Sequence, residues 1–570
     1  MKKKALLLTV LMLIISTVTT YASDGELNAA KFGMWTLIPP IVAIVLAFVT
    51  KNVVISLFIG VFSGAFILGL NDYGVVGAFV QGFLGIINYI IGSLADSWNA
   101  GIILQCLTIG GLIALISKMG GARAVAEALA KRAKSPVSAQ LITWVLGLFI
   151  FFDDYANALI VGPIMRPVTD KMKISRERLA FIIDATAAPI AGMALISTWI
   201  GYEIGLIKDA YGSIGQDVNA YGVFISTIPY RFYNILILAF IVVTAILLKE
   251  FGPMYKAERR ARMTGKVLAD DARPMATEEA TGLEPKPGTK LSVWNAIIPI
   301  GVLIVSAFAG FYYNGYTVLA EDAAMMEMIK SAPLSMAAIR ETFGASDASL
   351  VLFQAALLGS IVALAMGVKQ KIFTVSEGID TWIVGMKSLV ITGVILLLAW
   401  SLSGVIKELG TNWFLVKQLG DTLPAFILPS LIFILGSAIS FATGTSYGTM
   451  GILMPLTIPL AFAINPDQGY MLMSIGAVLT GAIFGDHCSP ISDTTILSSM
   501  GSACDHIDHV KTQLAYALTV GLVTVVFGYI PVGLGVPVYV VLPVALAAIV
   551  GIVHVFGKSV KVEDLEKANA

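Results

Sequence analysis

Long apolar stretches recur along the whole of this 570-residue chain, and they constrain its fold more than any other feature. Hydrophobic residues make up 57% of the sequence and charged residues only 13%, whereas a soluble globular protein carries roughly 25% charged residues. A chain of this size cannot hide so much apolar surface in a soluble core. We therefore expect a protein embedded in a lipid bilayer.

A helix needs about 20 mostly apolar residues to cross the hydrocarbon core. Clear runs of this kind lie near 101–117, 179–200, 222–248, 293–313, 350–367, 381–405, 513–534 and 536–556, and apolar regions interrupted by polar clusters lie at 137–165, 425–464 and 470–500. No strand-like alternation is visible. The sequence predicts an all-α polytopic membrane protein with about a dozen transmembrane helices.

The first residues resemble a secretory signal peptide over 1–22, with a basic start, a short apolar run and cleavage near Ala22; an uncleaved first membrane helix is the alternative. The predicted units after it are an N-terminal transmembrane repeat at 35–248, a cytoplasmic linker at 249–290, a C-terminal transmembrane repeat at 291–556 and a cytoplasmic tail at 557–570. Successive membrane helices place their loops on alternate sides of the membrane. For this alternation to hold, one of the three apolar runs in 38–98 must be short, re-entrant or surface-lying.

Basic residues set the expected orientation, because cytoplasmic loops are rich in Lys and Arg. They flank 137–165 on both sides, so this region should enter and leave the membrane from the cytoplasm as a re-entrant hairpin. The loop 465–469 holds no Lys or Arg, so the hairpin at 425–464 should enter from outside. Hairpins from opposite faces, with a weak ungapped match between 184–197 and 485–498, predict two inverted repeats with broken helices.

Two adjacent acids, Asp153 and Asp154, follow a strongly apolar run. An ionisable group at bilayer depth is costly and commonly marks an ion pathway. Two close carboxylates cannot both ionise cheaply, so one can hold either a proton or a sodium ion, which is a simple basis for antiport. We include Asn157 with them as a candidate cation- or proton-binding residue. A helix end in interfacial water is the alternative reading.

Asp184 lies inside an apolar run ahead of Pro189, which should break the helix and free backbone carbonyls for a cation. The second hairpin has a hydroxyl-rich break with Thr443, Thr445 and Ser446 as candidate substrate-lining residues. An interfacial aspartate and an ordinary extracellular loop are the alternatives at these two places.

The densest polar cluster is Gly485-Asp-His-Cys-Ser-Pro-Ile-Ser-Asp-Thr-Thr495. Oxygen ligands of this kind suit a hard cation. Asp486 and Asp493 are therefore candidates for cation or proton binding, and a sodium site is expected at Asp486, Ser492, Asp493 and Thr494. The remaining hydroxyls are candidate substrate-lining groups, namely Ser489, Ser492, Thr494 and Thr495.

The nearby histidines and cysteines match no standard structural zinc spacing. Cys504-Asp-His-Ile-Asp-His509 should instead form a cytoplasmic turn that caps the next helix, and its histidines leave a pH-sensing role open. No cofactor is expected beyond the transported sodium ion and proton.

The cluster 485–495 followed by Cys504-Asp-His-Ile-Asp-His509 resembles the C-terminal signature of the NhaC-type sodium/proton antiporter family, part of a larger ion transporter superfamily. Phe151-Phe-Asp-Asp-Tyr-Ala-Asn157 resembles its N-terminal counterpart, and the resemblance spans roughly residues 35–530. It implies two inverted repeats with hairpins, exchange of sodium for protons in a bacterial cytoplasmic membrane, and a homodimer with elevator-like motion. Some members of the family move organic acids or amino acids instead.

Two transport functions therefore stay open, together with a weaker enzyme alternative. Sodium/proton exchange is preferred over sodium- or proton-coupled transport of a small organic acid or amino acid, because the sequence shows no obvious intramembrane arginine to neutralise a carboxylate substrate. No motif of nucleophile, base and oxyanion hole is present, so an enzyme is not expected. The equal numbers of basic and acidic residues, 37 of each, give no reason to expect a nucleic-acid partner.

Overall fold

The computed structural model describes residues 24–50, 52–151, 153–274, 285, 288–419 and 423–569, and within these ranges the chain is almost entirely helical. The expected signal peptide at 1–22 lies outside the described residues. The only paired strands among the described residues are β1 (Lys249–Glu250) and β2 (Lys558–Ser559), which are antiparallel.

The elements before the central polar stretch are α2 (Asp24–Phe32), η1 (Gly33–Leu37), α3 (Ile38–Thr50), α4 (Val53–Ala95), α5 (Ser97–Lys118), α6 (Gly121–Ala130), α7 (Pro136–Phe149), α8 (Asp154–Lys171), α9 (Arg176–Ala185), α10 (Ala188–Ala191), α11 (Ile200–Ser213), α12 (Ala220–Thr227), η2 (Ile228–Tyr230), α13 (Phe232–Leu247) and, after β1, α14 (Gly252–Thr264).

The elements that follow are α15 (Trp294–Val318), η3 (Leu319–Glu321), α16 (Ala323–Ser331), α17 (Met336–Ala345), α18 (Ala348–Lys369), α19 (Val375–Ser388), α20 (Val390–Leu409), α21 (Thr411–Leu419), α22 (Leu428–Thr443), α23 (Ser446–Ile464), α24 (Gln468–Cys488), α25 (Asp493–Ser502), α26 (His506–Val523), the π-helical turn η4 (Thr524–Tyr529), α27 (Ile530–Gly533), α28 (Val538–Phe556) and α29 (Val562–Asn569).

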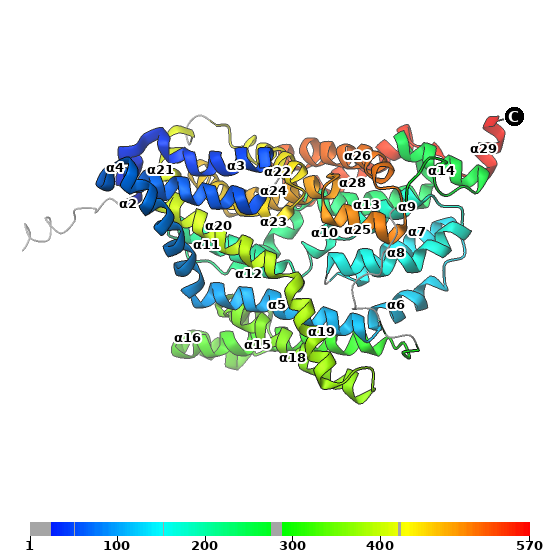
Figure 1. Ribbon diagram of the computed structural model, residues 1–570, viewed down its shortest axis with the longest axis horizontal. Coiled ribbons are helices and arrows are strands. Elements are labelled where there is room, and N and C mark those ends of the chain that lie inside the picture. The colour runs from blue at the N-terminus through cyan, green and yellow to red at the C-terminus, as the bar shows by residue number, and fades with distance from the viewer. Residues whose placement is uncertain are drawn as a thin grey trace, which may run out of the picture.

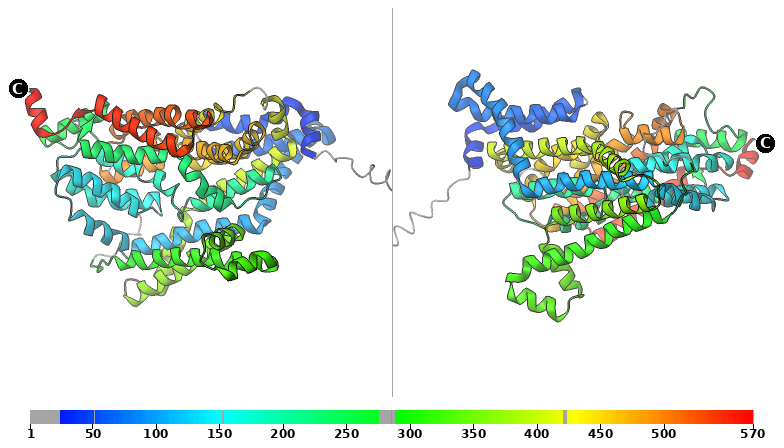
Figure 2. Two further views of the ribbon diagram at one scale, coloured as in Figure 1. Left: turned by 180° about the vertical axis from the view of Figure 1, so that it is seen from behind. Right: turned by 60° about the horizontal axis from the view of Figure 1, so that its bottom comes forward.

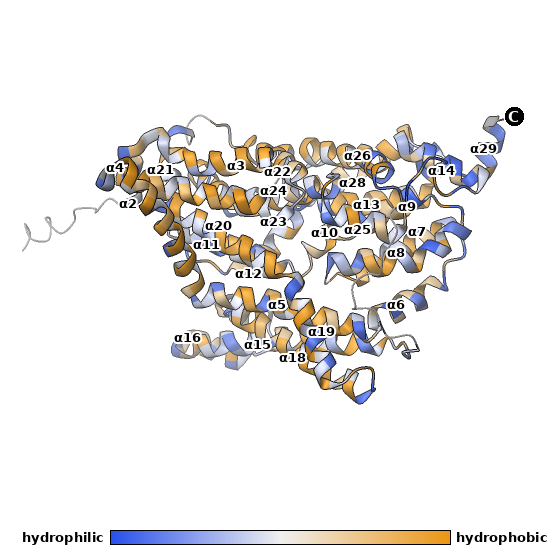
Figure 3. Cartoon of the chain, in the orientation of Figure 1, coloured by the Kyte–Doolittle hydropathy of each residue, from blue (hydrophilic) through white to orange (hydrophobic). Residues whose placement is uncertain are grey.

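Eleven helices among the described residues are long and apolar enough to cross a membrane, or twelve if the bent pair α12–η2 and α13 is one span. The prediction of about a dozen transmembrane helices is confirmed. Most helices run along the long axis of the molecule, with α14 and α29 at one end and α2 and α16 at the other (Figures 1 and 2). Apolar residues dominate the helices between these ends (Figure 3).

The centre of the bundle is α24, whose most apolar 18-residue window is 100% buried. Outer helices leave large apolar side chains exposed, such as Val305 of α15 and Tyr539 of α28. Exposed apolar surface is favourable only when lipid covers it, so the burial pattern agrees with a multi-pass membrane protein. The polar site residues predicted from sequence lie on α8, α9, α22, α23, α24 and α25 and at the breaks beside them.

Each of the two expected hairpins, 137–165 and 425–464, forms a pair of helices separated by a short break. Ser135 caps α7 through a capping box, and Pro136 fits the first helical position because its missing N–H needs no partner there. The break between α7 and α8 covers residues 150–153. In the second pair, α22 ends at Gly444, whose φ of +68° is the left-handed conformation that glycine tolerates best.

The two helix pairs occupy different halves of the molecule. In Figure 1, α7 and α8 lie toward the end that carries α14, whereas α22 and α23 lie toward the end that carries α21. Each pair is followed by a helix that ends early, α9 at Ala185 and α24 at Cys488, and then by a short helix. This order agrees with the expected repeats, and their relation by inverted symmetry stays a prediction.

Within the stretch 38–98, α3 has 13 residues and reaches the length of a membrane span only together with the residues from Gly25. The candidate spans here are Gly25–Ala47, Val53–Leu70 and Asp72–Ala95. Gly74 interrupts α4 with φ +62° and ψ −178°, and after it the chain runs across one end of the bundle rather than along it (Figures 1 and 2). Which of these runs is short, re-entrant or surface-lying stays a prediction.

The first half of the predicted linker is folded. Helix α14 packs on α9 through one ion pair and one backbone contact: Arg260 with Glu177 at 2.8 Å, and the Ser175 amide with Glu258 at 2.7 Å. Within α14, Arg262 pairs with Glu258 at 3.1 Å. Glu250, just before α14, is buried against Arg178 at 3.5 Å. Burial raises the pKa of Glu250 to about 7, although Arg178 opposes that rise.

Candidate functional site

Four breaks between helices converge on the same interior region. They separate α7 from α8, α9 from α10, α22 from α23, and α24 from α25. Helix α25 packs against both α8 and α9, and α24 packs against α22 and α23. Close approach is possible because small residues face one another: Gly162 of α8 lies against Gly501 of α25, where an added Cβ would come within 2.5 Å of the backbone. The polar residues that the sequence places at these breaks are therefore brought together from both halves of the chain.

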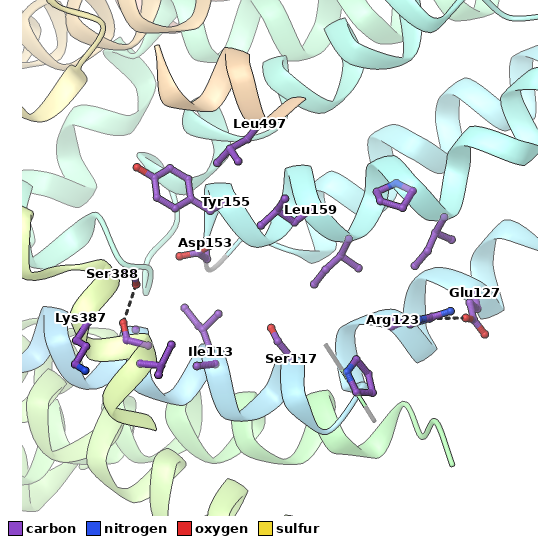
Figure 4. Close-up of a pocket in the computed structure, with 18 of the residues that line it drawn as sticks. Ile113, Ser117, Arg123, Glu127, Asp153, Tyr155, Leu159, Lys387, Ser388 and Leu497 are labelled. Atoms are coloured by element: carbon purple, nitrogen blue, oxygen red, sulfur yellow. Dashed lines mark hydrogen bonds and ion pairs between the residues drawn. The ribbon is translucent and has the colours of Figure 1, made fainter. Parts of the chain in front are cut away.

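The adjacent acids at the first break lie in different environments. Asp154 is the first residue of α8 and is buried. Asp153 precedes the helix and faces a cavity (Figure 4). Asp153 and Asp493 both act on Asp154 electrostatically. The two acids therefore present one carboxylate to the protein interior and one to the cavity.

Asn157 joins α8 to the break that follows α9. Its Nδ2 donates to the Thr186 carbonyl oxygen at 2.8 Å and to the Thr186 hydroxyl at 3.2 Å. The side chain is fully buried, and its Oδ1 has no hydrogen-bond partner within the described part of the chain. That oxygen is available to a cation or to a proton donor.

Asp184 lies within α9, one residue before that helix ends. Gln513 of α26 donates to its Oδ2 at 2.7 Å, and His509 Nε2 lies 3.8 Å from the same oxygen. The second oxygen, Oδ1, has no hydrogen-bond partner among the described residues, although the carboxylate is only 1% exposed. The break predicted after Asp184 is present, because α9 ends at Ala185 and Pro189 belongs to the separate turn α10.

Asp486 belongs to α24 and is held by the second helix pair. Ser446, the first residue of α23, donates to Asp486 Oδ2 at 2.7 Å. Asp486 Oδ1 has no hydrogen-bond partner in the described ranges, and the side chain is 3% exposed. Thr443 at the end of α22 donates to the Ile439 carbonyl at 2.9 Å, and the half-buried Thr445 occupies the position before α23 without a side-chain capping hydrogen bond.

The break between α24 and α25 is fastened by its own hydroxyls. Ser489 donates to the Phe441 carbonyl at 2.8 Å, and the hydroxyls of Ser492 and Thr494 share a hydrogen bond of 2.9 Å. Thr495 makes two long contacts with the carbonyls of Asp486 and His487, at 3.5 and 3.4 Å. These hydroxyls all lie in the buried interior and keep lone pairs that can accept.

Asp493 opens α25 and faces the first helix pair. Its Oδ2 accepts a hydrogen bond from the phenol of Tyr155, and its Oδ1 accepts from the Thr494 amide at 2.8 Å. Unlike Asp486, Asp493 is exposed. The two acids of the 485–495 cluster therefore connect to different hairpins, Asp486 to the second and Asp493 to the first.

No group of three or more His, Cys, Asp or Glu side chains among the described residues is arranged to hold a metal ion. A sodium ion at this site would therefore need hydroxyl, amide or carbonyl oxygens in addition to carboxylates. His487 bonds the Tyr233 phenol at 2.7 Å through Nδ1 and makes no side-chain bond to the acids. The turn at 504–509 caps α26 as expected, through Asp505.

A cavity of about 900 Å³ opens beside the first break. Figure 4 shows Asp153 and Tyr155 on one side and the Arg123–Glu127 ion pair at a distance from them. Its walls come from α5, α6, α8, α19 and α25 and are mainly apolar, including Ile113, Leu159, Ile160, Ile164, Val384 and Leu497. The cavity gives Asp153 access to solutes larger than a bare ion.

Several residues of the site carried no clear sequence signal. Tyr155 and Gln513 contact the acids only because distant helices meet. Arg231 is different: it lies at the 48° bend between α12–η2 and α13, is fully buried, and pairs with Glu203 at 2.7 Å. That the sequence shows no obvious intramembrane arginine to neutralise a carboxylate substrate stays a prediction, because Arg231, which lies inside the apolar run 222–248, already pairs with Glu203.

Comparison with known proteins gives relatives of this chain over different lengths. An uncharacterised protein of Haemophilus influenzae is 34% identical over 89% of this chain and 92% of its own length. The malate-2H⁺/Na⁺-lactate antiporter of Bacillus subtilis is 44% identical, over 18% of this chain and 22% of that protein. The Na⁺/H⁺ antiporter NhaC of Alkalihalophilus pseudofirmus is 29% identical, over 26% and 31%.

A solved structure and a family profile match most of the chain. The crystal structure of the Alcanivorax borkumensis YdaH transporter has a TM-score of 0.55 and 15% sequence identity, covering 88% of this chain and 99% of that one, which shows a similar fold. The profile of the Na⁺/H⁺ antiporter family matches residues 3–194 and 190–534. The membrane-spanning helices, the buried acids at their breaks and this match together show that the chain belongs to the Na⁺/H⁺ antiporter family.

Proposed function

We propose that this protein exchanges sodium ions for protons across the bacterial cytoplasmic membrane. The observation that carries the proposal is the pair Asp184 and Asp486, two buried carboxylates that each have one oxygen without a hydrogen-bond partner. An unsatisfied buried polar group costs about 1–3 kcal/mol, and more when charged. A bound proton or a bound cation removes that cost.

The two carboxylates are close enough to influence each other electrostatically, and Asp493 acts on both. A proton on one acid removes a negative charge that would otherwise attract a cation to the others. Protonation therefore lowers sodium affinity, and bound sodium opposes protonation, as reciprocal linkage requires. This competition couples the two fluxes in opposite directions.

We assign the sodium ligands to Asp486, Ser492, Asp493 and Thr494, with neighbouring hydroxyls as lining groups. Asp486 supplies an open carboxylate oxygen, and the Ser492–Thr494 pair retains acceptor lone pairs. Asp153, Asp154, Asn157 and Asp184 complete the set for cation and proton. No side chain needs to be covalently modified, and the transported ions are the only small species required.

Reconstitution of the full chain into proteoliposomes tests this proposal. A sodium gradient should drive proton movement in the opposite direction, read by an internal pH-sensitive dye. Asp486→Asn should abolish that flux, whereas Asp217→Asn, a change at an exposed loop acid, should preserve it. Absence of sodium-dependent proton flux in the unmodified protein would overturn the proposal.

A second function is sodium- or proton-coupled transport of a small organic acid or amino acid. The cavity of about 900 Å³ favours it, because a bare sodium ion needs far less room. The partial similarity to the malate-2H⁺/Na⁺-lactate antiporter agrees with it. Arg231 gives weaker support, because Glu203 already neutralises it. Uptake of labelled organic acids measured beside sodium-driven proton flux separates the two functions.

We also propose that the protein is a homodimer. The expectation comes from the resemblance to dimeric antiporters, and the extensive exposed apolar surface of the outer helices leaves room for a second copy beside lipid. Light scattering of the purified protein in detergent, corrected for bound detergent, gives the mass that decides this.

A further inference from the structure

Two histidines at the start of α26 are connected to each other by hydrogen bonds, and the second of them lies near Asp184. Ser499 Oγ lies 3.0 Å from His506 Nδ1 and 2.8 Å from His509 Nδ1. His509 Nε2 lies 2.8 Å from Gln513 Oε1 and 3.8 Å from Asp184 Oδ2. The series therefore runs from His506 through Ser499 and His509 to the buried acid.

The partners fix where the ring hydrogens lie. His506 Nε2 faces the Pro490 carbonyl oxygen at 2.7 Å, which can only accept, so this nitrogen carries a hydrogen. Gln513 uses its Nε2 to donate to Asp184 and to the His487 carbonyl. Its Oε1 therefore accepts from His509 Nε2. In the neutral rings, both Nδ1 atoms are then without hydrogen, and both face Ser499.

The Ser499 hydroxyl cannot donate a hydrogen bond to both histidine rings. Ser499 has a single hydrogen, and the Thr495 carbonyl competes for it at 2.8 Å. An additional proton completes the arrangement: a charged His506 donates its Nδ1 hydrogen to Ser499 Oγ, and Ser499 donates its own hydrogen to His509 Nδ1. The contacts are thus those of a site built to accept one proton.

The series has one end near the surface of the protein and the other end in its interior, as a proton path needs. His506 is half-buried, and its neighbour Ile507 is exposed. The turn lies against the folded start of the basic stretch, where the Arg273 amide bonds Asp505 at 2.9 Å. Basic segments mark the cytoplasmic side. His509 and Asp184, at the other end, are fully buried.

We propose that His506, Ser499 and His509 form a relay that carries protons between the cytoplasm and Asp184. The inference rests on the proposed sodium/proton exchange. A solvent proton binds His506. Its Nδ1–H bond breaks as Ser499 Oγ gains the hydrogen, and the Ser499 hydrogen moves to His509 Nδ1. His509 then releases its Nε2 hydrogen to Asp184 Oδ2 after the 3.8 Å gap shortens, so one proton moves and no electron does.

The test uses the full chain in proteoliposomes and compares two fluxes. Sodium–sodium exchange, followed with labelled sodium, needs no proton, whereas sodium-driven proton flux does. Ser499→Ala and His509→Gln should lower proton flux by about tenfold or more, the range for losing a positioned proton-transfer group. Sodium–sodium exchange should change by less than about twofold. Ser499→Thr, which keeps the hydroxyl, should restore proton flux.

His554→Gln is the matched control, because His554 is an exposed histidine at the end of α28, away from the relay. Unchanged proton flux in Ser499→Ala and His509→Gln would overturn the relay while leaving the proposed function intact. Equal loss of both fluxes in these variants would also overturn it, because that pattern marks a structural role. Absence of sodium-driven proton flux in the unmodified protein would instead overturn the proposed function.

Discussion

Tyr155 at the start of α8 donates its phenolic hydrogen to the carboxylate of Asp493 at the start of α25, although 338 positions separate them in the chain. The contact joins the first hairpin to the polar break after α24. It also places the starts of two helices beside each other, where unpaired backbone N–H groups favour negative charge. The acids of both halves are thereby held in one region.

Neutralising either acid at the first break should abolish coupled exchange. Asp154→Asn removes a buried charge next to Asp493, and Asp153→Asn removes the carboxylate that faces the cavity. We expect sodium-driven proton flux to vanish while membrane insertion is retained. Flux in proteoliposomes, with protein content checked by immunoblot, is the measurement. Full exchange in both single variants would contradict a role for the pair.

Cysteine labelling tests the orientation of the two hairpins. Arg123 precedes the first hairpin with a side chain 50% exposed, and Gln468 follows the second and is also exposed. The three natural cysteines are buried and should label slowly. Arg123→Cys should react with an impermeant maleimide only from the cytoplasmic side, and Gln468→Cys only from outside. Labelling of both from one side would contradict the inverted repeats.

Sodium affinity should depend more on Asp493 than on His487. Asp493→Asn removes a charged ligand from the proposed cation site and should weaken sodium binding at least about tenfold, or 1.4 kcal/mol. His487→Ala should have a smaller effect, because that ring contacts Tyr233 rather than the acids. Sodium dependence of transport measures both. Wild-type dependence in Asp493→Asn, with loss in His487→Ala, would reverse the assignment.

The buried pair of Arg231 and Glu203 should be costly to break from either side. Removing one partner of a buried ion pair costs about 3–5 kcal/mol, because the other charge stays unpaired. Arg231→Met and Glu203→Gln should each lower the melting temperature in detergent. The double variant should be more stable than either single one. Additive losses in the double variant would show that the two side chains do not stabilise each other.

Stability should fall as pH rises through the range set by Glu250. Its pKa is raised from 4.5 to about 7 by burial, so between these values the folded state holds a proton that the unfolded state has released. The free energy of unfolding therefore decreases with rising pH across this window and levels off above it. Glu250→Gln should flatten that slope. Melting temperatures in detergent between about pH 5 and 8 provide the measurement.

The sequence by itself determined the class of protein and the identity of its polar residues. Apolar runs of sufficient length require helices in lipid, because only internal hydrogen bonding can satisfy the backbone there. Acids such as Asp184 and Asp486 stand out since charge at that depth is costly. Pro189 and Gly444 indicate breaks for local reasons, a missing N–H and a left-handed backbone.

Only the tertiary structure decided which of these groups meet. Contacts such as Tyr155 with Asp493, or Gln513 with Asp184, depend on the packing of helices far apart in sequence, and hydropathy carries no information about their rotation. The same reason hides the pairing of Arg231: a charge is visible in a sequence, but its partner Glu203 on another helix is not. Helix packing, set by small residues such as Gly162 and Gly501, fixes those partners.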